Sequence, residues 1–300
     1  MASAKKTQTK NTLAKKQSAS TAITGKVRPG RSRLAGNLSA VGLGLIIPVI
    51  IAIVWEVAGR MHWIANGLFP PLSLCVAALA DWVFGLHLFG DQFNPSTVYS
   101  ASWLVHVGAS VGRVLIGFLI GTLLAIAFGV IAGVSLHGRR MIDPTINAIR
   151  PISVTGWVPL ALIIFGIGDK PAVFLTALAT FFPVYVNTLA GVSRVDTGLV
   201  RAGRMLGAKP AELIMKIVLP AASPSIVTGL RVATGIAWTT VVVAEILGAK
   251  SGVGYVLIDS YNQFRFDYVI AAMATLGLCG YVTDRLLQWV FADALRWSDK

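Results

Sequence analysis

Charged side chains inside long apolar blocks are the residues of this sequence most able to do chemistry. Arg113, Arg231 and Glu245 lie within such blocks. Surrounding a charge with apolar groups is costly, so each is a candidate functional residue. Arg113 could extend outward to a polar surface or face a cavity. Arg231 could pair with backbone carbonyl groups or attract an anion, and Glu245 could be a solute ligand or simply a charge at a helix end.

Uncharged polar residues form a second group of candidates. Trp238, Thr239 and Thr240 follow one another in the same apolar block as Glu245. They could offer an aromatic surface and hydroxyl groups to a polar solute. Equally, they could pack inside the protein with the hydroxyls bonded to their own helix. Asn187 is a further polar candidate, in the preceding block.

Three prolines interrupt one apolar segment, residues 142–167, which contains Pro144, Pro151 and Pro159. A break at membrane depth frees backbone groups, which must be covered by protein or face a water-filled cavity. The segment is therefore predicted to line a pathway, with Pro159 as a candidate.

No residues have the spacing of a catalytic or metal site. The sequence contains no nucleophile with a plausible base, no carboxylate pair and no phosphate-binding loop, and Cys75 and Cys279 are far apart. Two distant cysteines indicate neither a metal site nor a disulfide framework. We therefore predict a protein that is not an enzyme and holds no cofactor in this chain.

The composition indicates a membrane protein. Hydrophobic residues make up 55% of the chain and charged residues 13%, with a mean hydropathy of +0.72. Soluble domains have about a quarter of their residues charged. We predict an all-α, polytopic membrane protein with six transmembrane helices, each using about 20 apolar residues to cross. The predicted spans are 38–58, 103–136, 142–167, 171–192, 222–248 and 268–291.

Charge and hydropathy divide the chain into four segments. Residues 1–36 contain nine Lys and Arg residues and no acid, which predicts a disordered basic tail near anionic lipid, without nucleic-acid binding. Residues 37–102 contain the first span and an outer amphipathic helix near 71–83. Residues 103–292 form the core, and 293–300 a short polar C-terminus.

The distribution of Lys and Arg predicts the orientation. Besides the tail, basic residues concentrate in 139–150, in 194–216 and at the C-terminus. The segments between other pairs of spans hold only Arg60, Lys170, Lys250 and Arg265. Basic loops stay in the cytoplasm, so both termini and residues 195–220 are expected there.

Small residues recur every four positions in the second predicted span. They are Gly117, Gly121, Ala125, Gly129 and Gly133. Such spacing lets two helix backbones approach closely. The partner could be a helix of the same chain or a second copy of the protein, and both remain open.

Residues 195–220 form the longest polar interruption in the C-terminal half and predict two short helices. Asp196 or Thr197 can cap the first helix. Gly207 can end it, because glycine adopts the left-handed conformation readily. Pro210 suits the first turn of the second helix.

Pro220 is predicted to end that second helix. On the first helix, Arg201 and Arg204 lie on the polar side, and the opposite side collects small and apolar residues: Leu199, Ala202, Gly203 and Leu206. An amphipathic helix of this kind could rest on lipid headgroups. It could also be presented to a soluble partner.

Residues 201–220 resemble the EAA loop of ABC importer permeases, with a small-residue helix, a glycine and an apolar helix ending in Leu-Pro. Arg201 stands where the family usually has glutamate, and Gly203 replaces the second alanine. The matching residues are Ala202, Gly207, Ile217, Leu219 and Pro220. With the flanking FFPVYVNTLAGV and PSIVTGLRVATGIAWTTVVVAEILGAKSGVGY, the chain resembles the nitrate/sulfonate/taurine branch over about residues 100–292.

The resemblance implies a type I ABC importer permease in the bacterial cytoplasmic membrane, moving a small and expectedly anionic solute. Its implied partners are a second permease, expected to be an identical copy, two cytoplasmic ATPase subunits that bind ATP and Mg²⁺, and an extracytoplasmic substrate-binding protein. The expected ATPase-coupling residues are Arg201, Ala202, Gly203, Gly207, Ile217, Leu219 and Pro220. The candidate pathway residues are Pro159, Asn187, Arg231, Trp238, Thr239, Thr240 and Glu245.

The alternative is a self-contained secondary transporter or channel. That class predicts inverted repeats with paired broken helices. The sequence has one broken segment, near 144–159, and no clear counterpart in the other half.

Overall fold

The computed structural model describes residues 33–61, 68–86 and 99–295, and no strand occurs in these ranges. The chain divides into two compact units, Met1–Val54 and Trp55–Lys300. Of the predicted tail, 1–36, only residues 33–36 are described, and of the predicted C-terminus, 293–300, only residues 293–295, which end the last helix. The second unit contains the helices that position the candidate sites.

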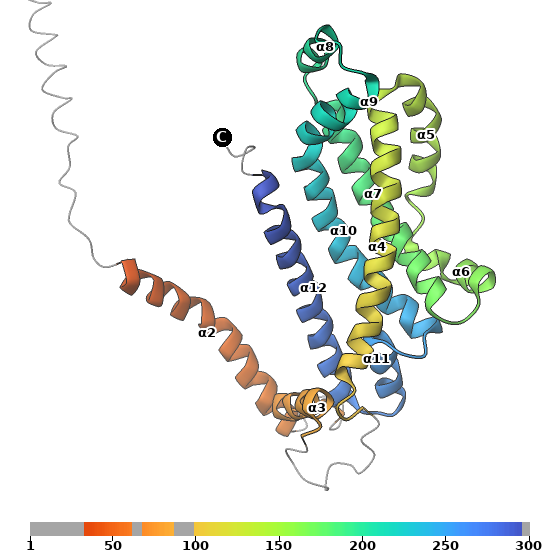
Figure 1. The fold of residues 1–300 in the computed structure, drawn as a ribbon. Coiled ribbons are helices and arrows are strands. Elements are labelled where there is room, and N and C mark those ends of the chain that lie inside the picture. Colours follow the sequence, from red (N-terminus) through yellow and green to blue (C-terminus); the bar gives the residue numbers. More distant parts are fainter. Residues whose placement is uncertain (1–32, 62–67, 87–98, 296–300) are drawn as a thin grey trace, which may run out of the picture. The chain divides into compact units, whose positions relative to one another are not determined.

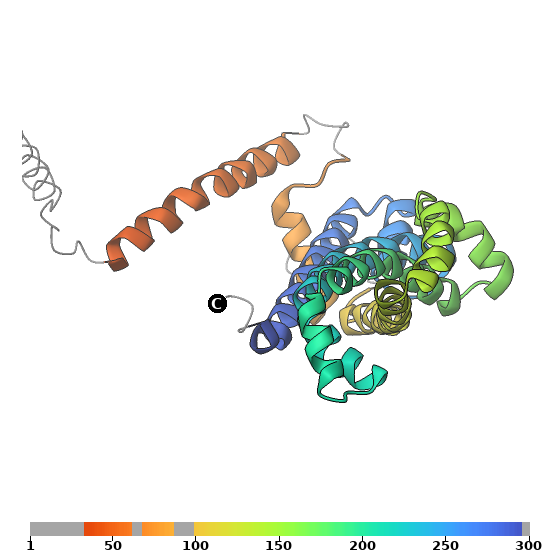
Figure 2. The ribbon, with the colours of Figure 1, turned by 90° about the horizontal axis from the view of Figure 1, so that it is seen from above.

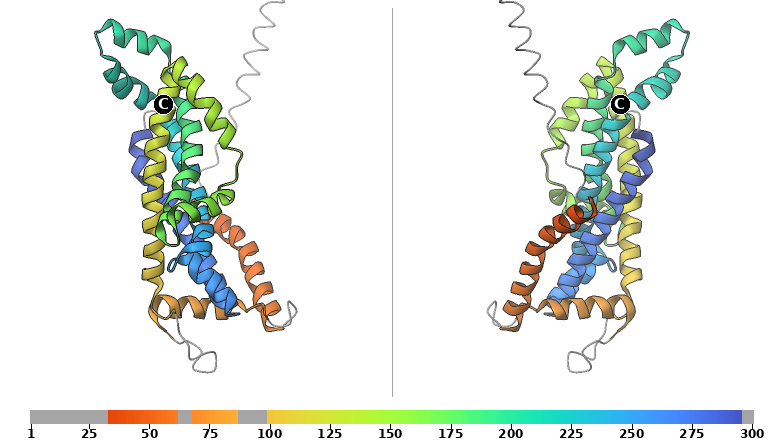
Figure 3. Two further views of the ribbon diagram at one scale, coloured as in Figure 1. Left: turned by 90° about the vertical axis from the view of Figure 1, so that its right-hand side faces the viewer. Right: turned by 90° about the vertical axis from the view of Figure 1, so that its left-hand side faces the viewer.

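Four long helices run through the second unit (Figures 1 and 3). They are α4 (Trp103–Val134), α7 (Asp169–Ser193), α10 (Leu219–Gly248) and α12 (Phe266–Leu295). Helix α7 packs between α4 and α10, and α12 packs on α10. Among the described residues, four stretches are long and apolar enough to cross a membrane: 103–134, 169–193, 210–248 and 266–291. These match four of the predicted spans.

The predicted first span, 38–58, lies within helix α2 (Arg33–Arg60). It is not one of the four stretches, and its crossing of the membrane stays a prediction. In the part of α2 that belongs to the second unit, Glu56 accepts hydrogen bonds from the backbone N–H of Ser73 at 2.9 Å and from its hydroxyl at 2.9 Å. These bonds attach the end of α2 to α3 (Leu72–Phe84), which is the predicted amphipathic helix.

The proline-rich segment predicted as a span over 142–167 is bent, and the bent pair of helices is apolar enough to be one broken span or a re-entrant loop. Helix α5 (Leu136–Ile149) is followed by the turn η3 (Val154–Trp157) and α6 (Val158–Phe165), and the two arms meet at 87°. Only Pro151 lies at the break. Pro144 lies inside α5, and Pro159 lies in the first turn of α6, where a missing N–H is tolerated. Seen from above, α6 and α8 (Thr197–Met205) project from the bundle in different directions (Figure 2).

The small residues of α4 pack against α7 of the same chain, which answers the question left open by their spacing. A Cβ added to Gly121 would lie 2.1 Å from Thr180 Oγ1 and 2.3 Å from the Ala177 carbonyl oxygen, and one at Gly129 would lie 2.8 Å from Thr188. Only glycine permits this approach. The seam therefore joins two helices of one subunit.

The prediction that Pro220 ends a helix is wrong. Helix α9 (Pro210–Leu213), the π-helical turn η4 (Ile214–Val218) and α10 follow without a break. In η4 the Leu219 N–H bonds to the Ile214 carbonyl, five residues back. This wider turn displaces the carbonyl groups that a proline ring would meet in an α-helix, so Pro220 fits the first turn of α10.

The end of the unit opposite α8 contains α3 and α11 (Val253–Asn262) (Figure 1). Here the Tyr99 hydroxyl donates a hydrogen bond to the Asp259 carboxylate. Burial, and then the bond to Asp259, raise the pKa of Tyr99 above its usual range. Tyr99 therefore stays a neutral donor and holds the start of α4 to α11.

We predict that Gly121→Ala lowers the stability of the folded protein by about 1–3 kcal/mol, because the added methyl group meets backbone as well as side-chain atoms. The measurement is the apparent melting temperature of the purified protein in detergent. Gly112→Ala is the matched control on α4, since no atom lies within 4 Å of its added Cβ. Equal melting temperatures for the two variants would contradict the close contact between α4 and α7 at Gly121.

Candidate functional site

The loop between α7 and α10 is an elbow with defined ends. The Asp196 carboxylate accepts a hydrogen bond from the Gly198 N–H at 2.8 Å and caps α8. At the other end, the Ala208 N–H donates to the Gly203 carbonyl at 3.1 Å and the Gly207 N–H to the Arg204 carbonyl at 3.0 Å. Gly207 has φ of 80°. This is a Schellman motif, so the predicted cap at Asp196 and the predicted end at Gly207 are confirmed.

Helix α8 is attached to the rest of the elbow through Gly203. Gly203 is buried, and a Cβ there would lie 2.6 Å from Ile217 Cδ1 and 2.7 Å from Leu213 Cδ2. Because Gly203 has no side chain, α8 packs directly on α9 and η4. This contact and the two capped ends fix the position of α8 on the elbow.

The predicted apolar face of α8 is only partly buried. Gly203 packs inside, whereas Leu199 is 53% exposed and Leu206 is 88% exposed. The reason is that close packing at a glycine keeps the longer neighbouring side chains outside the contact. Met205, which is 89% exposed, was missed by the sequence analysis. Its position beside Leu206 at the helix end was the available signal.

The other predicted coupling residues divide between the surface and the interior of the elbow. Arg201, Ala202 and Pro220 are exposed, while Ile217 and Leu219 are half-buried. The elbow thus presents α8 outward and supports it from behind with apolar side chains.

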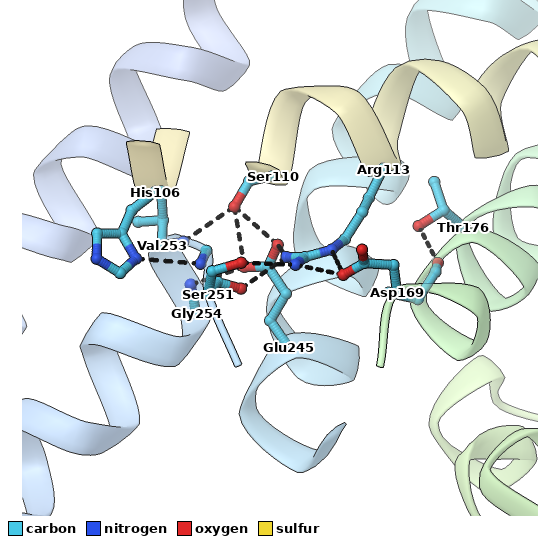
Figure 4. Close-up of polar contacts among 11 residues, drawn as sticks. His106, Ser110, Arg113, Asp169, Thr176, Glu245, Ser251, Val253 and Gly254 are labelled. Carbon is cyan, nitrogen blue, oxygen red and sulfur yellow. Dashed lines mark hydrogen bonds and ion pairs between the residues drawn. The ribbon is translucent and has the colours of Figure 1, made fainter. Parts of the chain in front are cut away.

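An ionic cluster around a buried arginine lies at the end of α7 opposite the elbow, and its contacts are drawn in Figure 4. Arg113 on α4 contacts Glu245 Oε1 of α10 at 2.5 Å through one nitrogen. Its other nitrogen contacts Asp169 Oδ1 of α7 at 2.6 Å. Arg113 is 5% exposed and Glu245 0%. Arg113 therefore neither extends to the surface nor faces an open cavity, because its guanidinium group lies between the buried Glu245 and Asp169, whose side chain is 71% exposed.

Further hydrogen bonds complete the cluster (Figure 4). The Glu245 carboxylate accepts from the Ser110 hydroxyl at 2.8 Å and from the Gly254 N–H at 2.9 Å. The Ser251 carbonyl accepts from Arg113 at 2.7 Å. The cluster joins α4, α7 and α10 to the start of α11. Sequence analysis treated the charges separately and missed Asp169, although its place just before the start of a predicted span was a signal.

The remaining pathway candidates lie on α6, α7 and α10. Arg231 pairs with Asp284 of α12, Nε to Oδ1 at 3.2 Å, and not with backbone carbonyls. The Thr239 hydroxyl donates to its own helix at the Ile236 carbonyl, 2.9 Å. Both Arg231 and Thr239 are exposed, eight residues apart on one face of α10.

Among the other pathway candidates, only Pro159 is exposed. Trp238 is buried and donates to the Thr283 hydroxyl at 3.2 Å. Asn187 is half-buried and donates to the Pro183 carbonyl at 2.8 Å. Thr240 is half-buried, and Pro159 is exposed on α6.

No group of three or more His, Cys, Asp or Glu side chains in the described ranges could hold a metal ion.

Comparison with known proteins defines the class. Residues 98–294 match the family model for the binding-protein-dependent transport system inner membrane component. The chain therefore belongs to this family of ABC transporter permeases.

Two relatives and one solved structure illustrate the similarity. The chain is 31% identical to an aliphatic sulfonates transport permease protein of Bacillus subtilis over 91% of each chain. It is 31% identical to the taurine transport system permease protein of Escherichia coli over 79% of this chain and 82% of the relative. The fold resembles an inward-facing structure of the MetNI methionine ABC transporter, with a TM-score of 0.52, 21% identity and coverage of 65% of this chain and 95% of that one.

We predict that Arg113→Met destabilises the protein by about 3–5 kcal/mol, because it leaves Glu245 buried without its charged partner. Lys216→Met is the control. It removes an exposed pair with Glu212, whose side chains are 74% and 43% exposed, and should cost about 0–1 kcal/mol.

Thermal unfolding in detergent measures both effects. Adding Glu245→Gln to Arg113→Met should recover part of the loss, since it removes the stranded charge. Equal losses in the two single variants would show that the cluster does not stabilise the bundle.

Proposed function

We propose that this chain is the membrane-spanning subunit of an ATP-driven importer and that its elbow, residues 195–220, couples a cytoplasmic ATPase to alternating access. The observation that carries the proposal is the geometry of α8. The helix is capped at both ends, packed through Gly203 and leaves Met205 and Leu206 exposed. A rigid projection with an exposed apolar surface can transmit movement from a docked partner.

The proposed assembly contains two permease subunits, expected to be identical, two ATPase subunits that bind ATP and Mg²⁺, and an extracytoplasmic binding protein. Both termini and the elbow lie in the cytoplasm, as the basic residues favour. ATP binding closes the ATPase subunits, moves the two elbows and opens the pathway outward. The binding protein then delivers solute to the outer opening. The chain itself carries out no catalysis.

The proposed solute is a small anion of the sulfonate or taurine type. The relatives named above support this class. On this chain, Arg231 offers an exposed cation on α10 and Thr239 a hydroxyl on the same face. Asp284 neutralises Arg231 through an exposed pair, which an arriving anion could replace at small cost.

A self-contained transporter or channel remains the alternative. It predicts two broken helices in corresponding halves. The described residues contain one bent pair, α5 with α6, which favours the ATP-driven importer.

We predict that Gly207→Val reduces ATP-dependent uptake by about an order of magnitude. A left-handed conformation costs a residue with a Cβ about 1–2 kcal/mol, and valine should distort the end of α8. Asparagine tolerates this conformation, and no atom lies within 4 Å of an added Cβ. Gly207→Asn is therefore the matched control and should keep most activity.

The assay is taurine or sulfonate uptake into proteoliposomes containing the permease, its ATPase subunit and binding protein. Full-rate uptake in vesicles without the ATPase subunit would overturn the proposed function. Unchanged coupling in Gly207→Val would reject only the role of the elbow.

We predict that Arg231→Gln lowers the uptake of anionic solute about fivefold, equivalent to roughly 1 kcal/mol for an exposed charge interaction, while ATP hydrolysis continues. Arg285→Gln is the control, because Arg285 is also exposed and donates to the Tyr281 hydroxyl at 3.0 Å on α12. If both variants transport equally well, Arg231 does not contact the solute.

A further inference from the structure

A hollow of about 320 Å³ lies between α8 and the ends of α4 and α7. Its walls are largely valine side chains, from Val134 at the end of α4 to Val200 on α8. Arg201 and Arg204 also line it, together with Ser193 and Thr197. An apolar hollow with two guanidinium groups and two hydroxyl groups has the chemistry of a site for an amphiphilic anion.

The positive charge in this hollow is not neutralised by the described part of the protein. Arg201 and Arg204 lie one helical turn apart, and neither forms an ion pair with a described acid. Asp196 is close in sequence but does not line the hollow, and its carboxylate is occupied by the Gly198 N–H. Like charges at this spacing destabilise a helix. A phosphate group would relieve the repulsion, and arginine binds phosphate in a bidentate manner.

An exposed apolar stripe on α4 leads away from the hollow. It consists of Ile120, Leu124, Ala127, Ile131 and Val134, which are all exposed and follow the 3–4 spacing of one helix face. Val134 belongs to both the stripe and the hollow. A molecule whose charged head fills the hollow could therefore lay hydrocarbon chains along α4.

We infer that this hollow binds an anionic phospholipid. The headgroup phosphate lies between Arg201 and Arg204, Ser193 and Thr197 donate from their hydroxyl groups, and the acyl chains follow the stripe on α4. Basic pockets between spans on the cytoplasmic side are typical sites for such headgroups. The inference rests on the proposed function only in placing the elbow on the cytoplasmic side.

Such a lipid would join the elbow to the bundle. It contacts α8 through the two arginines and the ends of α4 and α7 through the valines and Ser193. The lipid would then fill the space behind α8 while the opposite surface, with Leu199 and Leu206, stays available to a partner. Anionic lipid is thus a bound component of the coupling elbow.

The test is native mass spectrometry of the full-length permease with phosphatidylglycerol or phosphatidylcholine, without any ATPase subunit. We expect the wild type to retain phosphatidylglycerol about thirtyfold more strongly, since the two arginines together contribute about 2 kcal/mol. The variant Arg201→Gln with Arg204→Gln should lose this preference. The control, Arg140→Gln with Arg150→Gln, removes the same charge at exposed positions outside the hollow and should keep it.

Several outcomes would overturn the inference. One is an equal loss of preference in the test and control variants, which would indicate general attraction to the surface. Another is binding of inorganic phosphate or glycerol phosphate that displaces the lipid completely, which would make a soluble anion the ligand. A third is an unchanged preference for phosphatidylglycerol in the double variant of Arg201 and Arg204, which would show that the two arginines do not hold the headgroup. Melting temperatures establish that each variant is folded, and transport is not needed, so the proposed function can fail or stand separately.

Discussion

A bilayer provides no hydrophobic force that would press one apolar helix against another, so helix contacts within it depend on close packing and on satisfied polar groups. The glycines of α4 meet this constraint by letting α7 approach through Thr180 and Thr188. On its other side, α7 meets α10, where a Cβ at Gly229 would lie 2.8 Å from Asn187 Cβ. The central position of α7 therefore follows from small residues on both neighbours.

The same constraint explains the ionic cluster. A lone charge among apolar side chains would be expensive, but Arg113 is shared between two carboxylates, and Glu245 accepts further hydrogen bonds. Replacing such a cluster by apolar residues could be equally stable, since burying charges costs desolvation energy. What the cluster adds is a specific geometry, because the guanidinium group joins α4, α7 and α10 in one arrangement.

The two ends of the bundle are consequently held together by different interactions. One end is held by charge-assisted bonds between several helices. The other carries an elbow attached through Gly203 and through a π-helical turn that continues into α10. Movement of α8 can thus reach α10 directly, and the proposed lipid would give α8 a second contact with α4 and α7.

The sequence by itself determined the class of protein and the local structure. Span-length apolar runs predicted four of the long helices, and the residues at 196 and 207 predicted both ends of α8, because caps and left-handed glycines act over a few residues. The family resemblance was also visible in the loop itself and is confirmed by the family match.

Only the tertiary structure decided which helix faces pack against each other. Arg113 finds its partners 56 and 132 residues away, and Gly121 finds Thr180 in its own chain instead of in a second copy. The bend after α5 and the continuation of the helix through Pro220 were also settled there. Local patterns specify which residues favour a helix or a close contact, but the choice of partner depends on how all the helices pack at once.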